Sequence, residues 1–207
     1  MHRLEKVLLT AGVMMPVLYF GTVALSALFY PGYSHVTQYA SELGSSQAPL
    51  SVVFNSGIVL TGAATIVAGV GFFGVALRLT GRRVVSALVG LSLALFGIAL
   101  LVGAMFPMPD PRHGAFGLGV TVHVAPFLLA TALWRRRSLR LLNGFLLAAG
   151  LVMLILLAVS MGVGGLVTRS NVGIFQRAYA LTVFSWPAVA ASQLLRSERL
   201  AARGAVS

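Results

Sequence analysis

The sequence predicts an all-α, polytopic membrane protein, a single domain over residues 1–207 with six transmembrane helices. Charged residues make up 9% of the chain and hydrophobic residues 58%, whereas an ordinary soluble domain carries about 25% charged residues. Six apolar runs occur that are each long enough to cross ~30 Å of hydrocarbon as a helix. The basic residues gather on one side of these runs, as the positive-inside rule describes.

The first three predicted spans cover residues 7–30, 50–77 and 84–106. Basic residues precede the first span and lie between the second and third. The first span contains Pro16. A proline inside a transmembrane helix is tolerated because neighbouring helices satisfy the freed backbone groups, so the run is still predicted as one helix.

The last three predicted spans cover residues 115–134, 141–161 and 174–194. Pro126 and Pro187 lie inside the fourth and sixth spans and are tolerated for the same reason. Trp134 stands beside a cluster of arginines, as an aromatic anchor at the membrane interface does. This position favours the end of the fourth span near residue 134.

The lysines and arginines divide unequally between the two sides. Twelve fall on the side of the chain termini: Arg3, Lys6, Arg78, Arg82, Arg83, Arg135, Arg136, Arg137, Arg140, Arg196, Arg199 and Arg203. Three fall on the other side: Arg112, Arg169 and Arg177. This bias predicts that both termini are cytoplasmic.

The net charge of +11 does not indicate nucleic acid. The arginine clusters follow the predicted spans, no nucleic-acid motif occurs, and the loops are too short for a further domain. The clusters instead suit contact with anionic membrane lipid. The expected partners are therefore membrane lipid and a possible small-molecule or lipid ligand at the outer leaflet, with no nucleic acid.

The first outer loop, residues 31–44, holds much of the scarce polar chemistry. Ser34 is able to cap a short helix and Gly44 to close it. Within it His35, Gln38 and Glu42 share one face at helical spacing. We predict a short amphipathic helix at the interface, whose polar face meets either water or the mouth of a site. Ser41 lies in the same segment.

The second outer loop, residues 107–114, contains three prolines that restrict its conformations. One interpretation is a rigid turn in which Asp110 and Arg112 form a local ion pair. The other is a carboxylate and an imidazole, Asp110 and His113, held in place at the membrane surface.

His123 and Arg177 are predicted to lie within the spans. An ionisable residue in a span is a hypothesis of function by default. For His123 the alternative is a neutral imidazole that is hydrogen-bonded to Asn55 or Ser56. Arg177 requires a carboxylate partner, for which the outer-side choices are Glu42 and Asp110, or else it extends to a lipid phosphate.

No metal site is predicted. His113 and His123 are ten residues apart, unlike a zinc-binding pair at i and i+4. The sequence also contains no hydrolase or phosphate-loop motif and does not identify a cofactor.

Four segments resemble one family when they are taken together in order: YPGYSHVTQYASELG from residue 30, FNSGIVLTG from 54, VGAMFPMPDPRHGAFGLGVTVHVAPF from 102 and GIFQRAYAL from 173. The chain resembles the domain of unknown function 998 family, small six-helix membrane proteins of bacteria and archaea. The resemblance implies the fold, the topology and a multi-pass protein of the bacterial or archaeal cytoplasmic membrane, but no reaction. Ser41, Glu42, Asn55, the loop from Asp110 to His113, His123 and Arg177 match its recurrent positions.

Three functions remain open at this stage. An enzyme acting on a lipid or lipid-linked head group would use His123 or His113 as general base, Glu42 or Asp110 as orienting carboxylate and Arg177 as phosphate clamp. The ligand candidates are Arg177, Ser41, Asn55 and His35. A binding or transport module would use the same groups as a polar cavity. In an accessory structural subunit they would hold helices together. The positions of four residues distinguish these functions: Glu42, Asp110, His123 and Arg177. If they meet in one cavity, a site is indicated, and if they are dispersed, the structural role is favoured.

Overall fold

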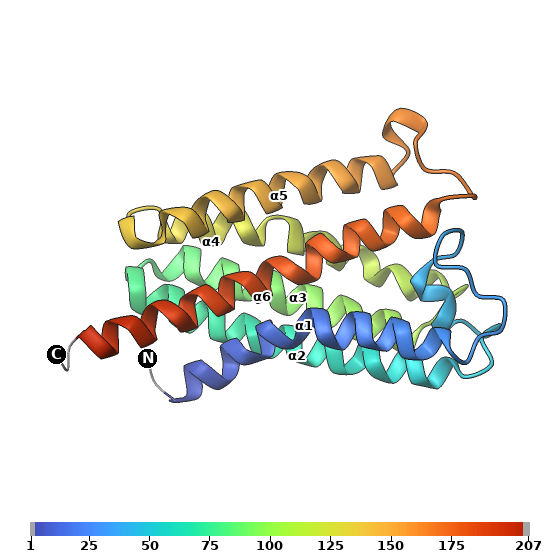
Figure 1. Ribbon diagram of the computed structural model, residues 1–207, viewed down its shortest axis with the longest axis horizontal. Helices are drawn as coiled ribbons and strands as arrows, with labels where there is room; N and C mark the ends of the chain where they lie inside the picture. Colours follow the sequence, from blue (N-terminus) through green and yellow to red (C-terminus); the bar gives the residue numbers. More distant parts are fainter. Residues whose placement is uncertain (1–2, 205–207) are drawn as a thin grey trace.

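The computed structural model describes residues 3–204 as a bundle of long helices (Figure 1). The helices are α1 (Arg3–Ala27), α2 (Ser51–Thr80), α3 (Arg83–Met105), α4 (Ala125–Leu133), α5 (Arg140–Ser160) and α6 (Val172–Gly204). Six helical segments of the described chain are long and apolar enough to cross a membrane, the fourth being Pro111–Leu133. The predicted fold class is therefore confirmed.

The helices pack in an order that differs from their order along the chain. α2 packs along both α1 and α3, and α6 packs against both α1 and α5, crossing the bundle diagonally in Figure 1. α2 and α3 approach closely at glycine pairs. A Cβ atom on Gly62 would lie 2.8 Å from the Gly97 carbonyl oxygen, and one on Gly69 would lie 2.8 Å from the Gly90 carbonyl oxygen. Small residues at such contacts are typical of helix pairs in membranes.

The outward surface of the helices is apolar, as a lipid-facing surface is expected to be. Leu60, Leu91 and Ile155 are each more than half exposed. The interior is also apolar, with Phe72 and Trp186 almost fully buried. A bundle that is apolar both inside and outside is suited to a hydrocarbon solvent rather than to water.

The fourth span is broken, and the prediction of a regular helix over residues 115–134 is wrong for its first half. Residues Pro111–His123 form 3₁₀ turns, interrupted where Ala115 and Phe116 have φ values of 48° and 53°. The segment is rich in glycine, which favours this left-handed conformation at Gly117 (φ 79°). Pro126 then occupies the first turn of α4, a position where a missing N–H costs little.

The first outer loop also differs from its prediction. It contains one short 3₁₀ helix, η1 (Ala40–Gly44), instead of a helix from Ser34 to Gly44. Ser34 does accept backbone N–H groups from Val36 and Thr37, both at 3.3 Å, but these bonds form a turn. The carbonyl oxygen of Val36 accepts backbone N–H groups from the start of α6. In a continued helix this carbonyl would be used within the helix, so the chain forms a turn here instead.

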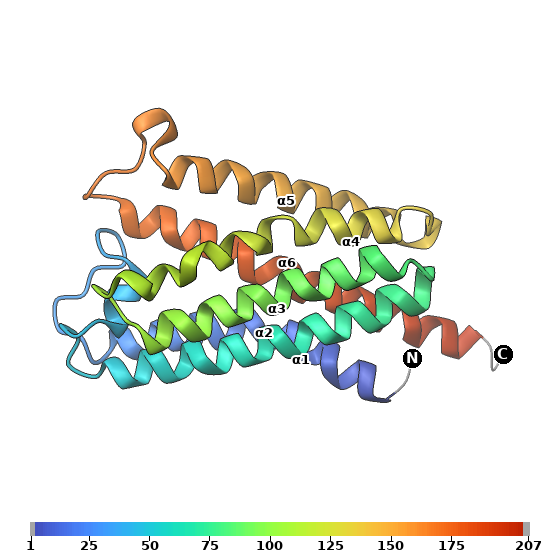
Figure 2. The ribbon, with the colours of Figure 1, turned by 180° about the vertical axis from the view of Figure 1, so that it is seen from behind.

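Two ends of the bundle can be distinguished. The arginine-rich end holds the start of α1, the end of α6 and the turns α2–α3 and α4–α5; the loop end holds the connections α1–α2, α3–α4 and α5–α6. Figure 2 shows the α2–α3 and α4–α5 turns at the same end as the termini. The side of a membrane that each end faces stays a prediction.

Candidate functional site

A small cavity at the loop end contains two of the predicted site residues. It has a volume of about 170 Å³, and its lining is mostly apolar, with Tyr19, Phe54, Ile58, Ala99, Leu100, Gly103 and Ala104. Three polar side chains complete the lining: Ser41, His113 and Gln176. Because they come from η1, the 3₁₀ segment after α3 and α6, only the folded bundle brings them together.

His113 lines this cavity, and one of its two ring nitrogens is engaged by backbone carbonyls. Its Nδ1 lies 3.0 Å from the Gly103 carbonyl oxygen and 3.1 Å from that of Phe106. A carbonyl only accepts, so Nδ1 is the ring nitrogen that donates a proton to these carbonyls. Among the described residues, Nε2 has no hydrogen-bond partner.

Ser41 and Gln176 add further hydrogen-bonding capacity. The Ser41 hydroxyl donates to the Met108 sulfur at 3.2 Å, so its oxygen lone pairs remain available. The Gln176 Oε1 atom accepts the Ala40 backbone N–H at 2.6 Å, which leaves its amide NH₂ as a donor. The cavity therefore offers an acceptor, a donor and a hydroxyl on an apolar background.

Arg177 follows Gln176 in α6 and fastens the loop between α1 and α2, the first loop, to α6. Its Nη1 donates to the carbonyls of Gln38 and Gly173, each at 2.9 Å. Its Nη2 donates to the Tyr33 hydroxyl and its Nε to His35 Nδ1 at 3.2 Å. The expectation of a carboxylate partner for Arg177 is wrong, because neutral acceptors of the loop occupy the guanidinium group instead.

Glu42 is satisfied within the first loop. Its two carboxylate oxygens accept the Gln38 side-chain amide at 3.0 Å and the Tyr39 backbone N–H at 2.7 Å. Asn55 holds the end of the same loop, since its side-chain amide donates to the Gly44 carbonyl at 3.0 Å. Glu42 and Asn55 therefore define the shape of the loop rather than face the cavity.

Burial and Arg177 shift the pKa values of two loop residues. Burial lowers the pKa of His35 from its ordinary value, and the neighbouring Arg177 cation lowers it further. Burial raises the pKa of Tyr33, although the Arg177 charge and hydrogen bond oppose that shift. Both shifts keep these side chains neutral, as their hydrogen bonds to Arg177 require.

Asp110 forms the local ion pair that the sequence offered as one interpretation. Its carboxylate accepts Arg112 Nε at 3.0 Å and Nη2 at 2.7 Å, and the Arg112 guanidinium lies 3.8 Å from the centre of the Phe106 ring. These hydrogen bonds lower the pKa of Asp110 to about 2. Asp110 does not bond to the His113 ring, whose Nδ1 turns toward α3.

His123 is a buried, fully satisfied imidazole. It is 2% exposed, its Nδ1 lies 2.8 Å from the Val120 carbonyl oxygen and its Nε2 lies 2.7 Å from the Tyr179 hydroxyl. The two rings stack with their centres 5.6 Å apart. Its side-chain partner is thus Tyr179 of α6, not Asn55 or Ser56 of α2, which the alternative interpretation had named.

Glu42, Asp110, His123 and Arg177 therefore do not converge, whereas Ser41 and His113 share a cavity. Sequence reasoning missed Gln176, although it lies next to Arg177, and Tyr179, which lies one turn further along the same helix. Among the side chains that the structure describes, which end at residue 197, no three His, Asp or Glu residues lie close enough together to hold a metal ion.

The fold and these sites define a multi-pass helical membrane protein with a small polar cavity near one end of the bundle. A family model described as "protein of unknown function (DUF998)" matches residues 13–193. The chain belongs to this family, as its four sequence segments indicated. No curated protein and no solved structure shows significant similarity to the chain.

Proposed function

We propose that this protein binds a lipid or lipid-linked ligand in the loop-end cavity, as a non-catalytic binding module of the bacterial or archaeal cytoplasmic membrane. The observation that supports this most directly is that His113, whose Nε2 has no hydrogen-bond partner among the described residues, lines a mostly apolar cavity together with Ser41 and Gln176. An unprotonated imidazole nitrogen accepts a hydrogen bond from a ligand hydroxyl, and the Gln176 amide donates to a carbonyl or ester oxygen.

The size of the cavity favours a lipid over a compact soluble ligand. Pockets that enclose a drug-sized molecule measure about 300–1,000 Å³, whereas this one measures about 170 Å³. It admits a hydroxyl-bearing head group or a short piece of chain, and the remainder of the ligand stays outside. A lipid meets this condition because the bilayer accommodates the rest of it.

The enzyme alternative has less support from the geometry. A serine nucleophile is activated by a neighbouring base, but the Ser41 hydroxyl donates to the Met108 sulfur. His123 is occupied on both ring nitrogens, and Arg177 is occupied by the first loop. These three residues act as links between helices and loop, which is the role that the structural hypothesis gave them.

A photoactivatable monoacylglycerol tests the proposal, since it carries hydroxyl and ester groups on an apolar chain. The full-length protein in vesicles should be labelled near residues 99–104. Ser41→Leu fills the cavity and should reduce labelling there by about fivefold, equivalent to roughly 1 kcal/mol of binding. Ser170→Leu is the matched control, because Ser170 lies in the exposed α5–α6 loop. Equal labelling of both variants would exclude this cavity as the site.

A further inference from the structure

A second cavity lies at the arginine-rich end, away from the loop-end site. It has a volume of about 680 Å³ and lies between the α2–α3 turn and the α4–α5 turn. Leu79, Thr80, Thr131, Ala132 and Trp134 line it together with Arg82, Arg135 and Arg136. Its volume falls within the range of about 300–1,000 Å³ that small-ligand sites occupy.

The charge in this cavity has one sign. Three guanidinium groups line it and no carboxylate does. At this end Arg78 forms an ion pair with Glu5, between α2 and α1, and Glu5 does not line the cavity. Like charges repel when no counterion lies between them, so an anion entering this cavity would meet an uncompensated positive field.

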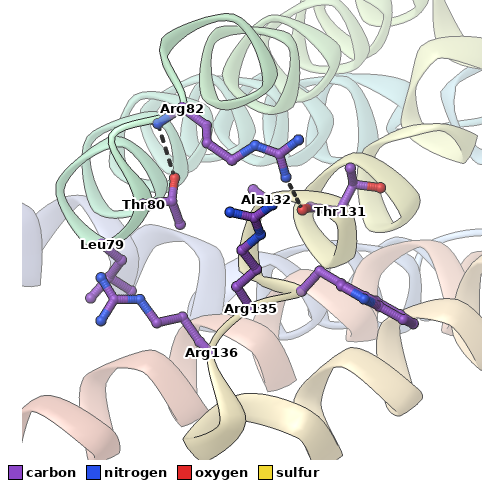
Figure 3. A pocket seen from close by; sticks show the side chains of 8 residues that line it. Leu79, Thr80, Arg82, Thr131, Ala132, Arg135 and Arg136 are labelled. Carbon is purple, nitrogen blue, oxygen red and sulfur yellow. Dashed lines mark hydrogen bonds between the residues drawn. The ribbon is translucent and has the colours of Figure 1, made fainter.

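Arg82 is held in place before any ligand arrives. Its Nη1 donates to the Thr131 carbonyl at 2.5 Å, one of the last carbonyls of α4. Its backbone N–H donates to the Thr80 hydroxyl at 3.2 Å, and that hydroxyl donates to the Ala76 carbonyl at 2.7 Å. Figure 3 shows the Arg82 side chain extended from one turn to the other. A prearranged cation loses less conformational entropy on binding.

Arg135 and Arg136 supply the opposite wall. Figure 3 shows Arg135 extending toward Arg82 and Arg136 extending toward Leu79. Within the described part of the chain, neither guanidinium group has a hydrogen-bond or ion-pair partner. Their donors are therefore available, in the fork geometry that matches phosphate oxygens.

The position of the cavity relates it to the membrane surface. It lies where α2 and α4 end and α3 begins, so it is level with the end of the apolar spans. Trp134, which is 67% exposed, lines its edge, and tryptophan is enriched at the depth of lipid head groups. Basic pockets between helices at this depth bind phosphate-bearing head groups.

We propose that this cavity is a phosphate-binding site in which Arg82 is the fixed ligand and Arg135 and Arg136 complete the coordination. The phosphate comes either from an anionic lipid head group or from a free phosphate compound, since both present the same oxygens. The site differs from the loop-end cavity in residues, in charge and in its end of the bundle, and it does not depend on the function proposed there.

Two double variants with the same loss of charge test the proposal. Arg135→Gln/Arg136→Gln removes two ligands of the cavity, and Arg137→Gln/Arg140→Gln removes two neighbouring arginines that do not line it. Titration of the purified full-length protein with short-chain phosphatidylglycerol, in a zwitterionic detergent, should show about tenfold weaker binding for the first variant and less than about twofold for the second.

Inorganic phosphate is the second probe and distinguishes the two sources. If Arg135→Gln/Arg136→Gln weakens the binding of both probes, the site recognises the phosphate group alone. If it weakens the binding of phosphatidylglycerol only, the site recognises a lipid head group. All four arginines are exposed, so the thermal midpoint should be unchanged in both variants. Equal weakening of the two variants would show diffuse surface attraction and overturn the proposal, as would absence of binding by the wild-type protein.

Discussion

The two ends of the bundle differ in how particular arginines are bonded. At the loop end, Arg177 is bound by neutral acceptors of the first loop and Arg112 by a carboxylate. At the arginine-rich end, Arg135 and Arg136 line a cavity without partners among the described side chains. The chain has 15 basic but only four acidic residues, so internal ion pairs cannot serve every arginine.

This difference separates two uses of the same side chain. An arginine that is enclosed by carbonyl, phenol and imidazole groups, as Arg177 is, acts as a structural link, because four of its five N–H donors are directed to the chain. An arginine that is exposed and unpartnered beside a cavity is available to an external anion. Substitution of Arg177 at the loop end is therefore expected to change stability, and substitution of Arg135 and Arg136 at the arginine-rich end to change binding.

The largest effect is expected from Arg177→Ala. The change removes three hydrogen bonds between α6 and the first loop and a fourth to the Gly173 carbonyl within α6, and a hydrogen bond to a charged group contributes roughly 1.5–3 kcal/mol. Because water replaces part of this loss, we expect roughly 2–4 kcal/mol lower stability. Thermal unfolding in detergent, followed by circular dichroism, measures it.

Two variants distinguish the link from the charge. Arg169→Ala removes an exposed arginine of the α5–α6 loop and should change stability by less than about 0.5 kcal/mol. Gly173→Ala keeps Arg177 but places a Cβ 2.5 to 2.8 Å from the carbonyl oxygens of His35, Gln38 and Val36. It should therefore lower stability, by roughly 1–3 kcal/mol. Equal effects of Arg177→Ala and Arg169→Ala would mean that charge alone matters.

A smaller effect is expected from His123→Leu. If His123 were a functional residue, this change would leave folding intact. The structure instead gives it a bond to Tyr179 across the bundle, and such bonds in membrane proteins contribute about 0.6–2 kcal/mol. We expect a loss in this range by thermal unfolding. Tyr179→Phe should reproduce most of it, and a stable His123→Leu variant with an unchanged midpoint would return His123 to the functional candidates.

The fold followed from the sequence because its main determinant is composition along the chain. A low charge content and long apolar runs define membrane spans without any knowledge of tertiary contacts. The break at Ala115 and Phe116 was not predicted, since hydropathy over a window does not report backbone conformation. The glycines around it and Pro111 were the available signal, because they weaken a regular helix.

The site was harder to predict because residue type does not identify a partner. Arg177 was expected to need a carboxylate, but backbone carbonyls of Gln38 and Gly173 serve it, and every residue carries a carbonyl. Ser41 and His113 were selected for their chemistry. Their shared cavity depends on the packing of four helices around them, which one sequence does not reveal.

The smallest effect is expected in the pH dependence of stability, through His35. It is also the most selective test of the loop end. Arg177 Nε donates to His35 Nδ1, so protonation of the imidazole removes the acceptor and places a second cation beside the first. The pKa of His35 is lowered in the folded state. The unfolded state therefore binds the proton at higher pH. The contribution of His35 to stability is complete above about pH 6.5 and falls as pH decreases toward the folded pKa.

His35→Asn does not titrate, so the thermal midpoint of the wild type should approach that of His35→Asn as the pH falls below about 6.5. A constant difference between the two proteins across this range would show that His35 does not link pH to the loop.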